Sequence, residues 1–181
     1  MPRYHQLGKI PPKRHTTFEK PEGGLYQEEL FGTIGFSGMS SLLYHLYPPT
    51  VVTESKAPYS VEPKIAVEKN MKALSFQGFS IAPEEDYLKS RKTLFTNKSL
   101  HIGLAAPKAF SKNYFYKNAD ADEMLFVHVG SGVLKTNYGK IPFKYGDYLI
   151  IPRGTIYQID FNDENNRLLY VESFDPIYTP S

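Results

Sequence analysis

Short apolar stretches separated by turn residues follow one another closely between Leu125 and Ser173. The pattern predicts antiparallel strands joined by tight turns, because the stretches are too short for long helices. The expected strands are residues 125–129, 133–136, 141–144, 148–151, 156–161 and 168–173. Strands that recur at about every eight to twelve residues are typical of an all-β sandwich or barrel.

The first hundred residues follow a less regular pattern. Extended pieces are expected around residues 40–47, 64–67, 73–79 and 100–104. One short helix is predicted at Pro83, since proline followed by acidic residues suits a helix N-terminus. We expect residues 1–60 to form an extended N-terminal arm with loops that pack on the barrel, and residues 61–181 to form the barrel itself.

Charge and composition exclude several classes of function. The 21 Lys and Arg residues are scattered and nearly balanced by 19 Asp and Glu, which predicts neither nucleic-acid nor membrane binding. The densest basic stretch, residues 9–15, is interrupted by prolines and is interpreted as a solvated arm in preference to an anion site. The absence of cysteine excludes disulfides and thiolate chemistry. Without an apolar signal core at the N-terminus, the protein is expected to be cytoplasmic.

The segment from Gly146 to Gly154 carries the most informative motif. A glycine, five residues and then Pro-x-Gly match the second sequence motif of cupins. Gly146 allows the turn before the strand, and Pro152 with Gly154 reverses the chain after it. Metal-binding cupins place a histidine and an asparagine shortly after this motif, but here those positions are Tyr157 and Phe161.

The upstream half of the cupin signature is also present. The stretch from Glu123 to Gly132 resembles the glutamate-to-glycine part of the first cupin motif, in which a His-x-His pair precedes the glutamate. Here the corresponding positions lie within residues 116–119 and contain no histidine. Only Glu123 remains of the four expected ligands, and a single carboxylate does not make a metal site. These motifs predict a cupin-like jelly-roll barrel with no metal site of its own.

The interior of such a barrel is expected to hold a degenerate cupin pocket lined by Tyr116, Asn118, Glu123 and Tyr157. Glu123 is predicted to be hydrogen-bonded or partly exposed. Tyr157, together with Phe161, is predicted to fill the space that the metal left, and core packing is favoured for it over a catalytic role. No residue of this chain is predicted to be catalytic.

His128 is the histidine nearest to the first motif. Alternation along the strand places Glu123, Leu125 and Val127 on one face and His128 on the other, away from the former metal position. The face that carries His128 is otherwise apolar, so we expect it to be covered by another layer or another chain.

Two further segments point to a particular family. The opening from Leu25 to Gly32, Leu-Tyr-x-Glu-x-Leu-x-Gly, is not a general cupin feature. This opening and the run Ser41-Leu42-Leu43-Tyr44 resemble the N-terminal half of homogentisate 1,2-dioxygenase. Residues 119–123 and 139–154 are similar to the same family, and the resemblance spans essentially the whole chain.

The resemblance implies an Fe(II)-dependent enzyme of tyrosine and phenylalanine breakdown, which opens the ring of homogentisate with dioxygen to give maleylacetoacetate. In that family the iron ligands lie in a C-terminal half, and this chain ends at Ser181, where the family continues. The chain alone is therefore expected to be inactive, to bind no Fe(II), and to serve as the scaffold and assembly lobe of a longer enzyme. Self-association into trimer-based homo-oligomers is implied as well.

Two alternatives remain open from the residues themselves. The first is a free-standing, metal-free cupin that binds a small ligand or a protein partner in or on the barrel. The second is a metal-independent isomerase or epimerase, in which His101 and Tyr157 would act as base and acid. The second alternative requires His101 to lie near Tyr157 inside the barrel.

Overall fold

The computed structural model of the protein describes residues 17–49, 51–57, 59–67, 70, 72–109 and 113–178. The chain divides into two compact units, residues 1–60 and residues 61–181. The packing of the N-terminal unit on the barrel stays a prediction, and the basic stretch 9–15 lies outside the described residues. Within the ranges described, no helix has the length and apolar character needed to cross a membrane.

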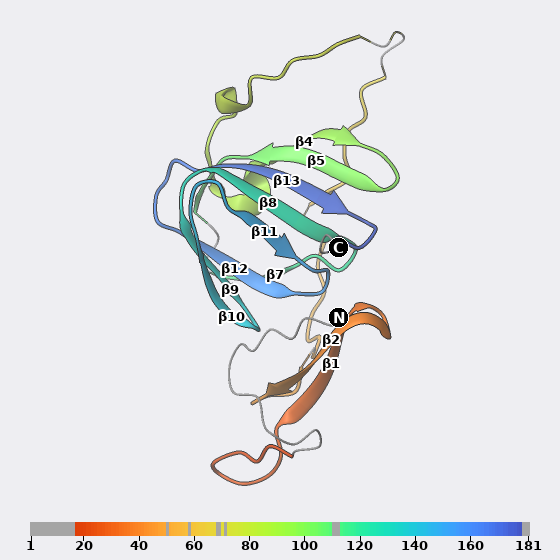
Figure 1. The fold of residues 1–181 in the computed structure, drawn as a ribbon, viewed down its shortest axis with the longest axis vertical. Coiled ribbons are helices and arrows are strands. Elements are labelled where there is room, and N and C mark those ends of the chain that lie inside the picture. Colours follow the sequence, from red (N-terminus) through yellow and green to blue (C-terminus); the bar gives the residue numbers. More distant parts are fainter. Residues whose placement is uncertain are drawn as a thin grey trace. The chain divides into compact units, whose positions relative to one another are not determined.

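The described residues of the N-terminal unit include an antiparallel hairpin (Figure 1). Strands β1 (Gln27–Ile34) and β2 (Ser37–His45) pair so that Leu30 lies opposite Leu42. Gly35, with a φ of 54°, provides the left-handed backbone conformation that the tight turn between them needs. β2 agrees with the extended piece expected near residue 40, whereas β1 is not indicated by any regular alternation in the sequence.

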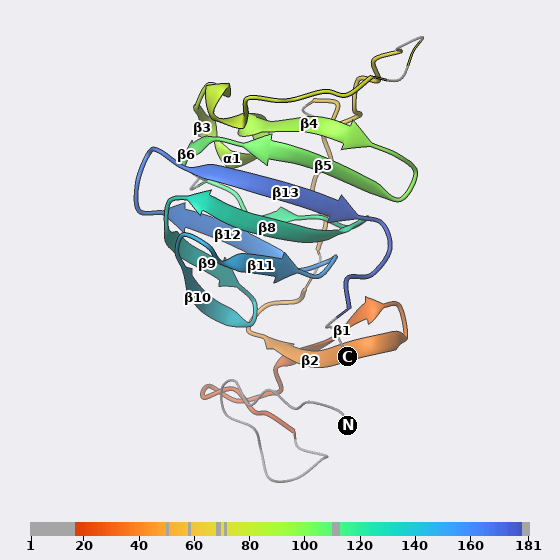
Figure 2. The same ribbon diagram turned by 45° about the horizontal axis from the view of Figure 1, so that its top comes forward.

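The second unit is built from two antiparallel sheets that face each other across one core (Figures 1 and 2). The five-stranded sheet has the order β11-β8-β13-β5-β4. Its strands are β4 (Arg91–Thr96), β5 (Leu100–Ala105), β8 (Asp122–Val129), β11 (Tyr148–Ile151) and β13 (Arg167–Ser173). The four-stranded sheet has the order β10-β9-β12-β7. Its strands are β7 (Tyr116–Lys117), β9 (Gly132–Thr136), β10 (Gly139–Phe143) and β12 (Ile156–Phe161). The all-β jelly roll predicted from the sequence is confirmed.

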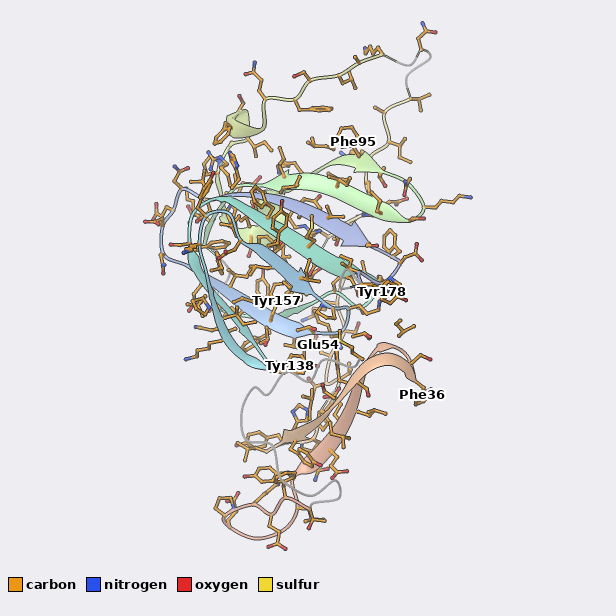
Figure 3. The ribbon with its side chains drawn as sticks, viewed as in Figure 1. Phe36, Glu54, Phe95, Tyr138, Tyr157 and Tyr178 are labelled. Atoms are coloured by element: carbon orange, nitrogen blue, oxygen red, sulfur yellow. The ribbon has the colours of Figure 1, made fainter. Side chains whose placement is uncertain are left out.

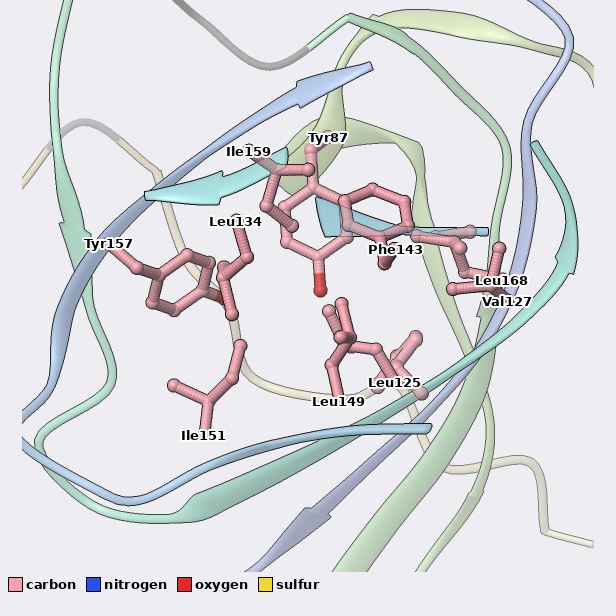
Figure 4. Packing of buried hydrophobic residues seen from close by; sticks show 12 residues of the cluster. Tyr87, Leu125, Val127, Leu134, Phe143, Leu149, Ile151, Tyr157, Ile159 and Leu168 are labelled. Carbon is pink, nitrogen blue, oxygen red and sulfur yellow. The ribbon is translucent and has the colours of Figure 1, made fainter. Parts of the chain in front are cut away.

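The core lies between the inner faces of these sheets. Figure 4 shows the rings of Tyr87 and Tyr157 among aliphatic side chains from both sheets, including Leu134 and Leu125. Along β8 the side chains alternate as predicted, because Leu125 and Val127 are buried while His128 is exposed. One face of β8 therefore belongs to the interior and the other to the outside of the barrel.

The short helix begins later than predicted. Glu84–Asp86 is not helical but forms strand β3, which pairs in parallel with β6 (Pro107–Ala109). Helix α1 (Tyr87–Ser90) follows, and the carboxylate of Asp86 accepts a hydrogen bond of 3.1 Å from the backbone amide of Lys89. Asp86 thus caps the helix from outside it, because pairing with β6 holds Glu84–Asp86 extended.

Two extended pieces expected before residue 80 are not strands. Residues 64–67 have no regular structure, and the piece at 73–79 runs into a single 3-10 turn, η1 (Gly78–Ser80). Neither piece has a partner strand in the described part of the chain, so local apolar character alone does not produce a strand there.

Candidate functional site: a buried charge network

The four residues predicted to mark the former metal position come together inside the barrel. Tyr157, labelled in Figure 3, projects from β12 into the core, and its hydroxyl donates a hydrogen bond of 2.8 Å to Oε2 of Glu123 on β8. Tyr116 lies opposite Tyr157 in the register of β7 and β12, with the two rings edge to face at 5.4 Å. Asn118 Nδ2 donates a hydrogen bond of 2.8 Å to Oε1 of Glu172 on β13.

Arg91, the first residue of β4, completes this group. Its Nη1 lies 3.2 Å from Oε1 of Glu123, and its Nη2 lies 2.8 Å from Oε1 of Glu172. The three side chains are 11%, 1% and 16% exposed, so the ion pairs are shielded from water. The guanidinium carbon lies 4.2 Å from the centre of the Tyr170 ring, a cation–π contact on one face of the group. One arginine thus holds two buried carboxylates.

The network continues onto strand β5. In the sheet register, Glu172 of β13 lies between Glu123 of β8 and His101 of β5. His101 Nδ1 is 3.3 Å from Oε2 of Glu172, and its ring meets the Phe174 ring edge to face at 5.0 Å. His101 therefore faces the interior, as the isomerase alternative requires. Its polar contact, however, is with Glu172, while the hydroxyl of Tyr157 contacts Glu123.

These residues do not fit the divalent metal that a cupin motif normally binds. Both oxygens of Glu123 already contact other groups, Oε1 the Arg91 guanidinium and Oε2 the Tyr157 hydroxyl. Burial raises the pKa of Tyr157 and of Tyr116 above the ordinary phenol value, so both stay protonated and are poor ligands. The described residues contain no group of three or more His, Cys, Asp or Glu side chains placed to hold a metal ion. The positive charge that pairs with Glu123 is the Arg91 guanidinium.

Glu123 is expected to titrate above the ordinary carboxyl value of 4.5. Burial raises its pKa, while Arg91 and the Tyr157 hydroxyl lower it only in part. In Tyr157→Phe one of these opposing contacts is lost, so the pKa of Glu123 should rise further. Carbon-13 NMR of the Glu123 carboxyl across a pH titration measures both values. A midpoint at or below 4.5 in the unmodified chain would contradict the buried position of the carboxylate.

The same shift sets the direction of a pH effect on stability. Between 4.5 and its raised pKa, Glu123 binds more protons in the folded state than in the unfolded state. The free energy of unfolding therefore falls as the pH rises through this window. The fall should be smaller in Glu123→Gln, which has no carboxyl group to titrate. Urea unfolding of both proteins at a series of pH values compares the two slopes.

Sequence motifs indicated only part of this network. Glu172 could have been found by strand alternation, because it shares the inner face of β13 with the buried Leu168 and Tyr170. Arg91 gives no such signal, since it stands beside Lys92 in a polar stretch that is typical of a surface. Its burial depends on how β4 pairs with β5, which the local sequence does not specify.

The fold and the network together define a cupin-like barrel with a buried charge network in its interior. Comparison with known proteins adds the family. The family model for the homogentisate 1,2-dioxygenase N-terminal region matches residues 6–180. The chain belongs to this family of homogentisate 1,2-dioxygenase N-terminal domains, and is thus a cupin related to dioxygenases.

Curated relatives include a protein of Saccharolobus solfataricus named "Putative dioxygenase", with 40% identity over 172 residues. The match covers 93% of this chain and 44% of that protein, so the chain spans less than half the length of this relative.

Solved structures similar to the chain include a cupin domain and two other proteins. The Cnp3 cupin domain of Schizosaccharomyces pombe has 21% identity and a TM-score of 0.43, covering 47% of this chain and 64% of that one. KdgF from a Halomonas species has 14% identity and a TM-score of 0.42, covering 48% and 78% of the two chains. A Streptococcus pyogenes protein has 14% identity and a TM-score of 0.47, covering 62% and 98%.

Proposed function

We propose that this chain is the N-terminal scaffold and assembly lobe of a homogentisate 1,2-dioxygenase. The whole enzyme would open the ring of homogentisate with dioxygen to give maleylacetoacetate, using Fe(II) held by residues outside this chain. The observation that carries the proposal is the closed charge network, because Arg91 and Tyr157 already contact both oxygens of Glu123. Iron that activates dioxygen needs open coordination positions, which this network does not offer.

The proposed role of the barrel is structural: it would support the fold of the longer enzyme. Its interior is filled by packed side chains and by a network in which the charged groups contact one another. Such an interior can present loops and faces to the rest of an enzyme without taking part in its chemistry. The family resemblance supports trimer-based self-association of the longer protein as part of the proposal.

An anaerobic titration with Fe(II) tests the division of roles. The 181-residue chain should show no stoichiometric binding and no oxygen consumption with homogentisate, whereas the product of a reading frame that continues beyond Ser181 should show both. Isothermal calorimetry and an oxygen electrode provide the two measurements. Stoichiometric tight binding of Fe(II) by the chain alone would overturn the proposal.

A variant of the longer protein can show that this lobe contributes to stability and not to catalysis. Arg91→Met, which leaves two buried carboxylates without their cation, should lower the free energy of unfolding but leave the rate of homogentisate consumption per bound iron unchanged at a temperature where the protein is folded. A stop codon after Ser181 in the gene would instead favour a free-standing ligand-binding cupin.

A further inference from the structure

A groove lies on the outer face of the five-stranded sheet, opposite the charge network. The segment 76–79 crosses this face, with the Phe76 ring 5.5 Å from the Phe95 ring of β4 and the Phe79 ring 4.9 Å from the ring of His128 on β8. Phe95 is labelled in Figure 3 on β4, at one end of this crossing. Between the segment and the sheet the structure leaves a hollow of about 530 Å³.

The hollow is lined mainly by apolar side chains. They come from the crossing segment and from the outer faces of β4, β5, β8 and β13, and they include Phe76, Phe79, Leu94, Leu104, Phe126 and Leu169. His128 and Arg167 are the polar side chains of the lining. A volume of this size lies within the range of small-molecule sites, about 300–1,000 Å³, and an apolar wall with few polar groups is typical of them.

Arg167 gives the hollow a positive charge. It is the first residue of β13, at an irregularity in the pairing with β8, and its Nη1 donates a hydrogen bond of 2.8 Å to the carbonyl of Asn166. Its Nε is buried and has no hydrogen-bond partner. Among the described residues no carboxylate forms an ion pair with its guanidinium, in contrast to Arg91, which has two. A buried N–H without a partner is unfavourable. A ligand acceptor that hydrogen-bonds to Nε would therefore gain binding free energy.

We propose that this groove binds a small carboxylate with an apolar body, of the size of a medium-chain fatty acid. The carboxylate would accept hydrogen bonds from the Arg167 guanidinium, and the apolar body would lie along Leu169 and Leu104 beneath Phe79. The negative charge of the carboxylate complements Arg167, which has no ion-pair partner among the described residues. The apolar walls of the groove complement the apolar body of the ligand. The site goes beyond the scaffold role, since it uses the outer face of the sheet and none of the residues of the charge network.

Binding of octanoate, with octanol as a neutral control of similar length, tests the proposal. Titrations of the chain followed by nitrogen-15 NMR should show saturable shifts at Phe126, Leu169 and Arg167, with octanoate bound more tightly than octanol. Arg167→Gln should weaken octanoate binding by about tenfold and change octanol binding little, because it removes a charge-assisted contact. Arg167→Lys, which keeps the charge, should retain more of the affinity.

Two further variants distinguish the contribution of the groove walls to binding from general effects of substitution on the fold. Phe79→Ala should weaken octanoate and octanol alike, whereas Lys140→Gln, on the exposed β10, should change neither. Thermal unfolding shows whether each variant is folded. Equal affinity for octanoate and octanol would overturn the proposal. So would an Arg167→Gln variant that is folded and binds octanoate normally. Finally, the proposal would be wrong if a second copy of the chain covered this face and left no saturable octanoate binding. Because the measurement needs no iron and no homogentisate, its failure is distinct from failure of the scaffold role.

Discussion

Replacing Arg91 with methionine is expected to destabilise the chain by about 3–5 kcal/mol. Methionine keeps most of the length of the side chain but leaves Glu123 and Glu172 buried without their cation. Urea unfolding at neutral pH measures the loss. Lys92→Met provides a matched control on the same strand, because Lys92 is about half exposed and its ion pair with Glu84 should contribute at most about 1 kcal/mol.

The reason for the loss can be checked by neutralising the partners. The triple variant Arg91→Met, Glu123→Gln, Glu172→Gln removes both orphaned charges and should recover much of the lost free energy. The single variant should also become relatively more stable as the pH falls, because protonation neutralises the carboxylates. An Arg91→Met protein as stable as the unmodified chain would show that the guanidinium does not hold this network together.

Replacing Tyr157 with alanine should cost about 3–5 kcal/mol, because it removes a ring that is completely buried in the core. Tyr157→Phe keeps the ring but loses the hydroxyl that donates a hydrogen bond to the buried Glu123, so it should cost less, about 1–3 kcal/mol. Tyr145→Phe, which removes the hydroxyl of an exposed tyrosine, should change the unfolding free energy little.

Urea unfolding of the three variants measures these costs side by side. If Tyr157→Phe were as harmful as Tyr157→Ala, the hydroxyl rather than the ring would dominate. If Tyr157→Phe had no effect, the hydroxyl of Tyr157 would not help to stabilise the buried carboxylate of Glu123.

The C-terminal strands were predictable because each carries its own signal. From β8 to β13 the apolar residues alternate or cluster between glycine, proline or asparagine turns, and these turns set the strand ends. β4 was not predicted, since its sequence Arg-Lys-Thr-Leu-Phe-Thr has few apolar residues, and it becomes a strand by pairing with β5. The helix was misplaced because β3 is held extended by β6, a contact distant in sequence.

The site was predictable to the extent that it follows a motif. The spacing of the cupin signature brought Glu123 and Tyr157 together, and the structure joins them by a hydrogen bond. The partners of the carboxylate were not predictable in the same way. Arg91 and Glu172 lie 32 and 49 residues from Glu123 along the chain. The register of β8 and β13 places Glu172 opposite Glu123, whereas Arg91 lies opposite Ala105 of β5 and reaches both carboxylates with its long side chain.

The buried arginine also constrains how such a barrel can evolve. If histidine replaced Tyr116, Asn118 or Tyr157 one at a time, each new ligand would face the guanidinium before any metal could bind. If Arg91 were lost first, Glu123 and Glu172 would be left as unpaired buried charges. Both orders pass through an intermediate less stable than its parent. Metal binding at this position would therefore require several substitutions together, because each single one lowers the stability of the barrel.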